Sequence, residues 1–456
     1  MIDALVVGRS LPALLAALEL AEVGLRVVVA GGTAELPDGP ERDVEGEIAA
    51  LLTRIAAPIA GPASAEPTGN AVEPAGNAAE DAGSAEGLRR ASAAPRKTPP
   101  QAPWLLARDG RWAPQPDPAV FGVPAVPLAA ETLRLLGTAG ALRAFLDRIT
   151  PLLTIGKTRA FGPLVRRRLG DSACRILVEP LLRERFGVPA DDVDVAIAAP
   201  GFSEALSRAG SLTAAALAYS ERNAERETGV EPTGGWSASS RALLERLSLY
   251  GVELLAAPAA DIEWQGDSWR TALGGGRVFE SAALVVDPEC GLSGASRRVI
   301  SDRGAAPARS RVHARIDILD PSDLPVGAVG VRSIGTWSLR IAHRREGGSW
   351  ALCSGPAVPA REAGATDPRP ELAAILQEAG LIPAPEAEWE VRTAPAPFVT
   401  LEERHRSEGA LRILAAAEPM LLPVGRSLHG GDLSVSLGAA RGGAIALRRH
   451  LLGLSE

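Results

Sequence analysis

The fold is decided by the start of the sequence, MIDALVVGRSLPALLAALELAEVGLRVVVAGG (residues 1–32). Residues 2–8 and 25–30 are apolar and rich in β-branched side chains, which predicts two buried parallel strands. Residues 11–23 are rich in Ala and Leu and are predicted to form a helix that ends at Gly24. This strand–helix–strand order, with a glycine where the first strand ends, is typical of a dinucleotide-binding βαβ unit.

The turn between the first strand and the helix departs from the usual glycine pattern. A dinucleotide-binding turn has the pattern G-x-G-x-x-G, whereas Gly8, Ser10 and Ala13 occupy the three glycine positions here. Gly8 keeps the residue that permits the tight turn. Ser10 replaces the glycine that lets the pyrophosphate approach, and Ala13 replaces the one that lets the helix pack on the strand. The dipole and free N–H groups of the helix would still attract an anion.

The composition indicates a globular protein that does not have nucleic acid as its main partner. The chain has 456 residues, enough for two or three domains, and a formal net charge of −7. Its three cysteines are scattered without disulfide or metal spacing, so we expect a protein of the reducing cytoplasm. The five histidines also lack metal-ligand spacing, and no apolar run reaches the roughly 18 residues of a transmembrane helix.

Two later stretches have clear patterns of their own. Residues 57–103 are dominated by small and polar residues, which cannot bury enough apolar surface to offset chain entropy, so a disordered insertion is predicted. Residues 311–318 alternate between polar and apolar side chains, which predicts a half-buried antiparallel strand. Its polar face would carry Arg311, His313, Arg315 and Asp317.

Four stretches, in order, resemble the flavin-dependent protoporphyrinogen and coproporphyrinogen oxidases of the amine-oxidase-like superfamily. They are RDGRWAPQPDPAVFGVP (108–124), FGPLVRRRLGDSACRILVEPLLRERFGV (161–188), GSLTAAALAY (210–219) and TGGWSASSRALLERLSLYGVEL (233–254). The resemblance implies FAD as the cofactor. It also implies oxidation of a porphyrinogen, with oxygen as the acceptor, in haem biosynthesis.

The fold implied by this resemblance is α/β, with a Rossmann-like FAD/NAD(P)-binding domain, a mixed-sheet substrate domain and an inserted helical domain. The expected dinucleotide-binding domain is discontinuous and comprises residues 1–56, 230–300 and 420–456. The expected substrate domain comprises residues 104–126 and 301–419, and the helical domain comprises residues 127–229. Residues 57–103 would form the insertion.

The resemblance also implies further cofactor contacts. Gly31 stands where the family has an acidic residue that binds the ribose hydroxyls. Gly425 and Arg426 stand where the family has a Gly-Asp pair close to the pyrophosphate. Gly438 and Ala439 belong to the small-residue stretch of the last helix, which packs against the flavin in the family.

The candidate substrate residues are less specific. Arg311, His313 and Arg315 could line a site for an acidic tetrapyrrole, or they could form an ordinary solvated sheet face. Trp236 could flank the flavin or belong to the core. We expect a small-molecule partner, neither nucleic acid nor a transmembrane segment, and a peripheral membrane contact stays open.

Two functions therefore remain open from the sequence. The first is a flavin-dependent porphyrinogen oxidase. The second is a paralogue that no longer binds FAD and serves as a tetrapyrrole-binding or partner protein, as the changes at Ser10, Gly31 and Arg426 suggest. Loss of two polar contacts of roughly 1.5–3 kcal/mol each would weaken FAD binding about 100-fold or more.

Overall fold

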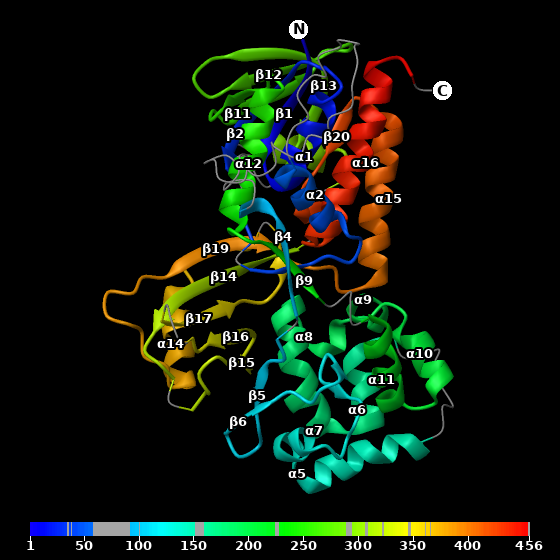
Figure 1. The fold of residues 1–456 in the computed structure, drawn as a ribbon, viewed down its shortest axis with the longest axis vertical. Coiled ribbons are helices and arrows are strands. Elements are labelled where there is room, and N and C mark those ends of the chain that lie inside the picture. Colours follow the sequence, from blue (N-terminus) through cyan, green and yellow to red (C-terminus); the bar gives the residue numbers. More distant parts are fainter. Residues whose placement is uncertain are drawn as a thin grey trace, which may run out of the picture. The chain divides into compact units, whose positions relative to one another are not determined.

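The computed structural model describes residues 1–33, 36–37, 39–57, 92–99, 101–150, 159–223, 228–288, 294–305, 309–321, 323–344, 348–360, 362–364 and 366–454. The chain divides into two compact units, each built from separated segments (Figure 1). Unit 1 comprises Met1–Pro100, Arg226–Ala306 and Glu408–Glu456. Unit 2 comprises Gln101–Glu225 and Pro307–Ser407.

The central sheet of unit 1 has the strand order β10-β2-β1-β13-β12-β11, and β20 also pairs with β13. Its parallel strands are β1 (Ile2–Arg9), β2 (Val27–Thr33), β10 (Glu253–Leu255), β13 (Val278–Val286) and β20 (Leu421–Pro423). Two antiparallel strands, β11 (Ala259–Trp264) and β12 (Trp269–Leu273), extend the sheet. Because β1 and β13 are parallel neighbours, their carboxyl ends meet at one edge.

Helices cover the central sheet because its strands are apolar on both faces. Ala4 and Val6 of β1 face one hydrophobic cluster, while Leu5 and Val7 face another. The first cluster includes α1 (Leu11–Ala21), which is buried at every position and packs against α16 (Leu433–Leu451). The helices α2 (Glu47–Ala56) and α12 (Trp236–Leu249) add to this cluster. The second cluster includes residues of α13 (Gly294–Ser301) and of α15 (Leu401–Ala417).

A small sheet in unit 1 consists of β3 (Glu41–Arg42), β9 (Gly229–Pro232) and β4 (Pro95–Thr98). Strand β4 falls within the predicted insertion at 57–103. This part is a regular strand instead, because its backbone pairs with β9 from Pro95 to Thr98. Most of the predicted insertion, residues 58–91, lies outside the described residues.

Unit 2 contains a mixed sheet of the order β18-β14-β17-β16-β15-β5-β6, with β19 also pairing with β14. Strand β14 (Arg309–Ile318) buries Ala314, Ile316 and Ile318 against α14 (Arg369–Ala379), so the predicted alternation is confirmed from Ala314 to Ile318. Arg311 is buried instead of lying on an exposed polar face. The other strands are β5 (Trp104–Leu106), β6 (Trp112–Pro114), β15 (Val329–Ile334), β16 (Trp337–Ala342), β17 (Ser349–Ser354), β18 (Val358–Pro359) and β19 (Glu390–Pro395).

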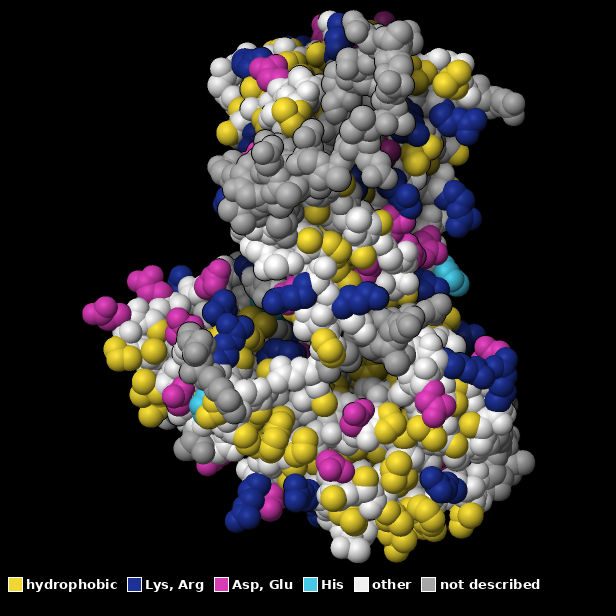
Figure 2. Space-filling view, viewed as in Figure 1, with side chains coloured by type: hydrophobic (Ala, Val, Ile, Leu, Met, Phe, Trp, Pro, Cys, Tyr) yellow, Lys and Arg dark blue, Asp and Glu magenta, His cyan; other side chains and the backbone are white. Residues whose placement is uncertain are grey.

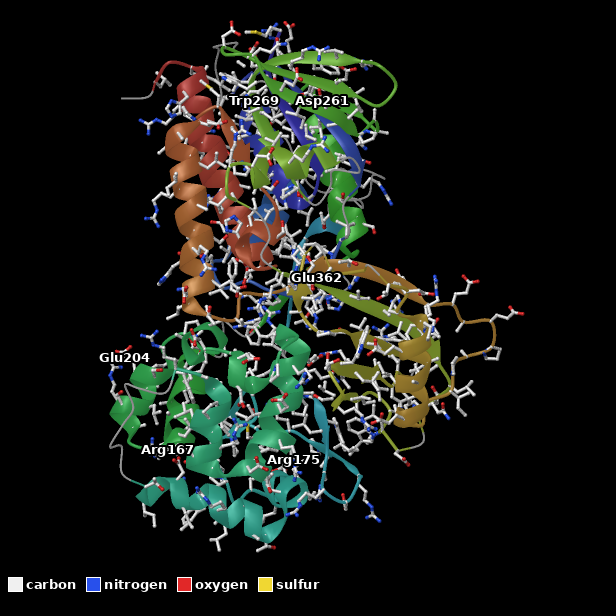
Figure 3. The ribbon with its side chains drawn as sticks, turned by 180° about the vertical axis from the view of Figure 1, so that it is seen from behind. Arg167, Arg175, Glu204, Asp261, Trp269 and Glu362 are labelled. Atoms are coloured by element: carbon white, nitrogen blue, oxygen red, sulfur yellow. The ribbon has the colours of Figure 1, made fainter. Side chains whose placement is uncertain are left out.

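The helices of unit 2 share a second core in which the rings of Phe161 and Phe202 stack. Arg168 pairs with the fully buried Asp147, whereas its neighbour Arg167 is exposed (Figure 3). The longer helices are α5 (Ala130–Phe145), α6 (Phe161–Leu169), α8 (Glu179–Phe186), α10 (Phe202–Ala209) and α11 (Leu212–Asn223). The shorter elements are β7 (Ala119–Val120), β8 (Val123–Pro124), η1 (Leu146–Ile149), α7 (Asp171–Ala173), the π-helix η3 (Cys174–Val178), η4 (Ala190–Asp192) and α9 (Val195–Ala198).

The α/β fold class predicted from the sequence is confirmed by these mixed sheets and their covering helices. Whether the helices of unit 2 form a domain separate from its sheet stays a prediction. Hydrophobic and charged side chains are interspersed on the face in Figure 2. In the described part of the chain, no helix combines the length and the apolar character needed to cross a membrane.

Candidate functional site: a dinucleotide turn with its own acid

The turn after β1 has the backbone shape of a dinucleotide-binding turn. Gly8 has a φ of 124°, a backbone conformation that favours glycine. Helix α1 begins three residues later, at Leu11. Ser10 is the N-cap of α1: its side-chain oxygen accepts a hydrogen bond from the Ala13 amide at 3.4 Å. Ala13 is fully buried in the hydrophobic cluster that contains α1.

A buried aspartate meets this turn from the neighbouring strand. Asp287 follows β13, and its backbone amide donates to the Val7 carbonyl oxygen at 2.9 Å. The Ser10 hydroxyl donates to the carboxylate of Asp287, which is 0% exposed. Sequence analysis missed Asp287, although an Asp directly after the apolar run that ends at Val286 is a visible signal.

Carboxylates of the chain also cap two other helices of unit 1. The two oxygens of Asp43 accept from the amides of Ile48 and Ala49, in the first turn of α2, at 3.0 and 2.8 Å. Asp432 is the N-cap of α16 and accepts from the Val435 amide at 3.1 Å. Each of these helix N-termini therefore already has an anionic group of the protein on it.

Arg426 is engaged within the protein. Gly425, with a φ of 127°, precedes the short helix η5 (Arg426–His429). The Nε atom of Arg426 donates to the Gly431 carbonyl oxygen at 2.9 Å, and its Nη2 atom donates to Glu41 at 3.0 Å. This ion pair links η5 to β3, so the guanidinium has partners without a ligand.

The small residues of α16 also have neighbours of their own. A Cβ atom added to Gly438 would lie 3.1 Å from the Glu45 carboxylate oxygen and 3.3 Å from Glu47 Cγ. Burial raises the pKa of Glu45, and the negative charges of Asp432 and Glu47 add to this rise. The space that Gly438 leaves open is thus taken by acidic side chains, while the next residue, Ala439, is exposed.

The two remaining unit 1 candidates differ in their surroundings. Gly31 is buried within β2 with a φ of 127°, and it brings no carboxylate to the position where a ribose would bind. Trp236 begins α12, is 5% exposed and donates from Nε1 to the Gly39 carbonyl oxygen at 2.8 Å. Trp236 belongs to the hydrophobic cluster around α1, which is the core alternative stated from the sequence.

The residues at the turn do not fit the pyrophosphate of FAD. Ser10 puts a side chain where that group needs open backbone, and Asp287 adds a carboxylate beside it. Two unit charges 4 Å apart repel by about 4 kcal/mol at an effective dielectric constant of 20. Arg9 adds a positive charge to the turn, but its buried Nε atom has no hydrogen-bond partner among the described residues.

In unit 2, Arg311 is a buried structural contact of the sheet. Its guanidinium donates to the carbonyl oxygens of Gly355 at 3.0 Å and Glu184 at 2.7 Å, and to the Ser338 hydroxyl at 3.4 Å. Burial lowers the pKa of Arg311 to about 10. Since Glu184 is in α8, Arg311 holds this helix against β14.

His313 and Arg315 lie further along the same face of β14. The Nδ1 atom of His313 is 2.8 Å from the Ser354 hydroxyl on β17. The Arg315 side chain is 41% exposed and its guanidinium lies over the Trp350 ring, 5.3 Å from the centroid. Arg392 of β19 is directly opposite His313. The structure therefore brings together three cationic or protonatable side chains, of which Arg315 is half exposed.

Comparison with solved structures gives the whole chain a known fold. A crystal structure named "Putative protoporphyrinogen oxidase" from Exiguobacterium sp. 255-15 matches 98% of this chain and 99% of its own, with 17% identity and a TM-score of 0.66. The chain has the same fold as this protein. The same fold occurs in a reduced UDP-galactopyranose mutase, at 13% identity over 100% of this chain and 96% of the mutase, with a TM-score of 0.57.

Another match is an oxidoreductase from Methanosarcina mazei, at 14% identity over 97% of this chain and 99% of that one, with a TM-score of 0.53. The resemblance read from the sequence is thus confirmed for the fold. Because a mutase and oxidoreductases share this fold, the fold alone does not fix the reaction.

At the level of sequence the likeness is local. Coproporphyrinogen III oxidase of Bacillus subtilis (strain 168) is 35% identical over 81 residues, which are 18% of this chain. The match spans only 17% of that relative's length. No family model matches the chain.

Proposed function

We propose that this chain is a member of the protoporphyrinogen oxidase-like fold that does not use FAD and that binds a carboxylate-bearing small molecule of the tetrapyrrole class. The observation that carries the proposal is the hydrogen bond between Ser10 and the buried Asp287 at the dinucleotide turn. It supports the second of the two functions left open by the sequence. A chain that does not bind FAD cannot use flavin chemistry, so we propose ligand binding as the function.

The ligand class follows from the side chains on β14 and β19. Arg315 presents a half-exposed guanidinium, whose planar fork matches a carboxylate, and His313 and Arg392 lie on the same sheet face. The Trp350 ring beneath Arg315 helps to position this guanidinium. These groups suit a planar acid, whereas Arg311 would support the sheet rather than touch the ligand.

A flavin-dependent oxidase is the competing function. The fold and the 81-residue match to a coproporphyrinogen III oxidase favour it. This function requires FAD in unit 1, where Ser10 and Asp287 oppose a bound pyrophosphate and acidic side chains take the space beside Gly438. The two functions therefore differ in a simple property, which is the presence of tightly bound flavin.

Two measurements test the proposal. The first is the visible absorption spectrum of the purified protein before and after incubation with FAD and gel filtration, and we expect no flavin band. The second is a titration with coproporphyrin III followed by its Soret band, alongside the tetramethyl ester. We expect binding of the acid, and about tenfold weaker binding or none for the ester, since the ester has no carboxylates.

An arginine variant with a matched control locates the binding surface. Arg315→Gln should weaken coproporphyrin binding by about tenfold, the loss of one charged hydrogen bond. Arg167→Gln changes an exposed arginine on α6 and should have no effect (Figure 3). A yellow protein would reject the FAD-free function, and equal affinities for acid and ester would reject recognition of the carboxylates.

A further inference from the structure

We propose that Ser10 and Asp287 form an internal plug that stands in for the pyrophosphate of a dinucleotide, and that removing the plug makes the turn of unit 1 bind FAD. This inference rests on the proposed absence of FAD from the natural protein. It goes further because it assigns the loss of FAD binding to two side chains and predicts that replacing them restores FAD binding.

The first argument for the plug is the position of Ser10 and Asp287. Ser10 occupies the second glycine position of the turn, where the backbone of dinucleotide-binding proteins approaches the pyrophosphate most closely. Asp287 comes from 277 residues further along the chain and reaches the same point, because β1 and β13 are adjacent and parallel. The two side chains thus meet at the edge of the sheet where such ligands bind.

The second argument is the negative charge of Asp287. A helix N-terminus attracts an anion. In the first turn of α1, the Ala13 amide donates to the Ser10 hydroxyl oxygen, and the Ser10 hydroxyl in turn donates to the Asp287 carboxylate. The carboxylate has the charge sign of a phosphate and is fully buried. A diphosphate at this place would have to displace the serine side chain and would also be repelled by the aspartate.

Ordinary helix capping does not account for the pair. A capping serine only needs to accept a hydrogen bond from the helix, and Ser10 does so with the Ala13 amide. The hydroxyl proton is available for any acceptor, including water. The α1 cap does not require a fully buried carboxylate at this point, and a buried charge is costly unless it is hydrogen-bonded.

What remains around the turn is compatible with a dinucleotide once the pair is removed. Gly8 retains the tight turn, Ala13 retains the close packing of α1, and Arg9 contributes a cation. Gly31 still supplies no ribose carboxylate, and Glu45 still lies against Gly438. We therefore expect measurable FAD binding in the unplugged protein that is weak compared with an evolved flavoprotein.

The test is FAD binding by the full chain carrying Ser10→Gly and Asp287→Asn. Asparagine keeps the size and one acceptor oxygen of Asp287 while removing the charge, and glycine restores the open backbone. Quenching of FAD fluorescence and the FAD-dependent shift of the melting temperature are measured together. We expect the double variant to bind FAD at least about tenfold more tightly than the natural protein, and each single variant to gain less.

A matched control separates the plug from a general change of charge. Asp261 lies on β11 and is exposed (Figure 3), so Asp261→Asn makes the same chemical change away from the turn. This variant should bind FAD no better than the natural protein. An equal gain in Asp261→Asn and in Asp287→Asn would overturn the plug.

Stability is followed by far-UV circular dichroism and thermal melting. If the double variant does not fold, Asp287→Asn alone is the deciding protein, and absence of any gain in FAD affinity in a folded Asp287→Asn variant overturns the proposal. A double variant that folds but binds FAD no better also overturns the plug, and it leaves the FAD-free function standing. Tight FAD binding by the natural protein would reject both the plug and the FAD-free function. The coproporphyrin titration tests the ligand class independently.

Discussion

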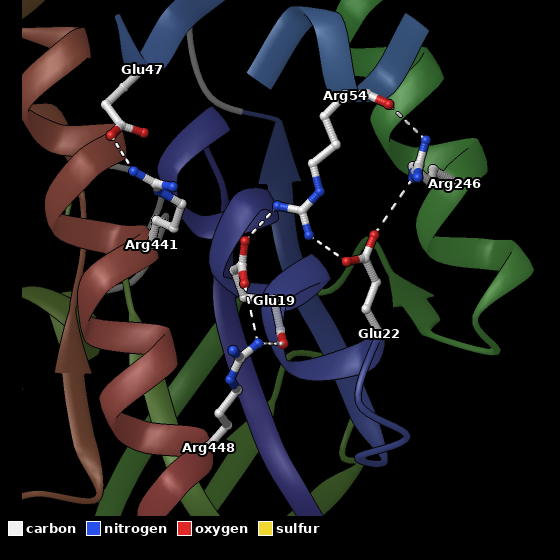
Figure 4. Close-up of polar contacts among 7 residues, drawn as sticks. All are labelled: Glu19, Glu22, Glu47, Arg54, Arg246, Arg441 and Arg448. Atoms are coloured by element: carbon white, nitrogen blue, oxygen red, sulfur yellow. Dashed lines mark hydrogen bonds and ion pairs between the residues drawn. The ribbon is translucent and has the colours of Figure 1, made fainter. Parts of the chain in front are cut away.

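Arg54 of α2 donates to the carboxylate of Glu19, a buried residue in the last turn of the otherwise apolar α1 (Figure 4). The second oxygen of Glu19 lies 3.4 Å from Arg448 of α16. Arg54 also pairs with Glu22, which lies 3.7 Å from Arg246 of α12. One buried carboxylate therefore connects α1 to two neighbouring helices in addition to their apolar packing.

Replacing Glu19 should destabilise unit 1. Glu19→Gln leaves Arg448 and part of Arg54 without their anion, and the Glu19 side chain is only 8% exposed. We expect a loss of about 2 kcal/mol in the free energy of unfolding, below the value for a fully buried pair because Arg54 is partly exposed and keeps Glu22. Urea denaturation of Glu19→Gln and of the natural protein measures this difference in the free energy of unfolding.

The control is the exposed pair of Glu204 and Arg208 on α10 (Figure 3). Their side chains are 64% and 58% exposed, so Glu204→Gln should change stability by less than about 0.5 kcal/mol. Similar losses in Glu19→Gln and Glu204→Gln would contradict the structural role of Glu19.

Arg311 should be essential for the stability of unit 2. Its guanidinium satisfies the carbonyl oxygens of Gly355 and Glu184 inside the protein. Arg311→Met should therefore cost about 3 kcal/mol or more, and Arg311→Lys should recover little because an ammonium cannot replace the planar fork. Thermal melting followed by circular dichroism tests this. Unchanged melting of Arg311→Met, with weaker coproporphyrin binding, would instead make Arg311 a ligand residue.

His429 should make the protein less stable in mild acid. Burial lowers the pKa of His429, and the nearby Asp432 and Glu408 oppose this only in part. A lowered pKa means that the unfolded chain takes up the proton first. The stabilising contribution is then present above the unfolded value of about 6.5 and is lost as the pH falls towards the folded value.

His429→Gln should therefore reduce the loss of stability between about pH 7 and pH 5.5, measured by urea denaturation at each pH. His405→Gln changes an exposed histidine of α15 and should leave the slope as it is. A steeper loss of stability in His429→Gln would mean that the protonated ring is the stabilising form.

Two cysteines should be unreactive in the native protein. Burial raises the pKa of Cys174 to about 11 and that of Cys353 to about 12, so almost no thiolate forms at pH 8. Cys290 lies outside the described residues, and Cys290→Ser removes its contribution. We expect no reaction of native Cys290→Ser with a thiol reagent and reaction of both remaining thiols in guanidinium. Rapid reaction of the native variant would contradict their burial.

Much of the fold could be predicted from local patterns. The run of apolar β-branched residues that includes Val27 predicts a strand buried on both faces, and β2 is buried from Val27 to Gly31. The alternation around Ala314 predicts one buried sheet face, which α14 covers. These predictions succeed because periodicity records which side of an element is buried, and burial dominates the free energy of folding.

The details of the candidate site could not be predicted in the same way. The acceptor of Ser10 is Asp287, and the partner of Arg426 is Glu41; both pairs join residues far apart in the sequence. Gly438 is an informative example, because its sequence context resembles a flavin-contacting helix while Glu45 fills the space beside it. A small residue predicts that something approaches closely, but not whether it is a ligand or another part of the chain.

The burial of α1 against α16 has a consequence for synthesis of the chain. Every residue of α1 is buried, and α16 begins at Leu433, near the other end of the sequence. At about 5–20 residues per second, a ribosome needs tens of seconds to make the intervening chain. During that time β1, β2 and α2 are already made, but the Leu- and Ala-rich helix still lacks α16, and this segment is where we expect a chaperone to bind the nascent protein.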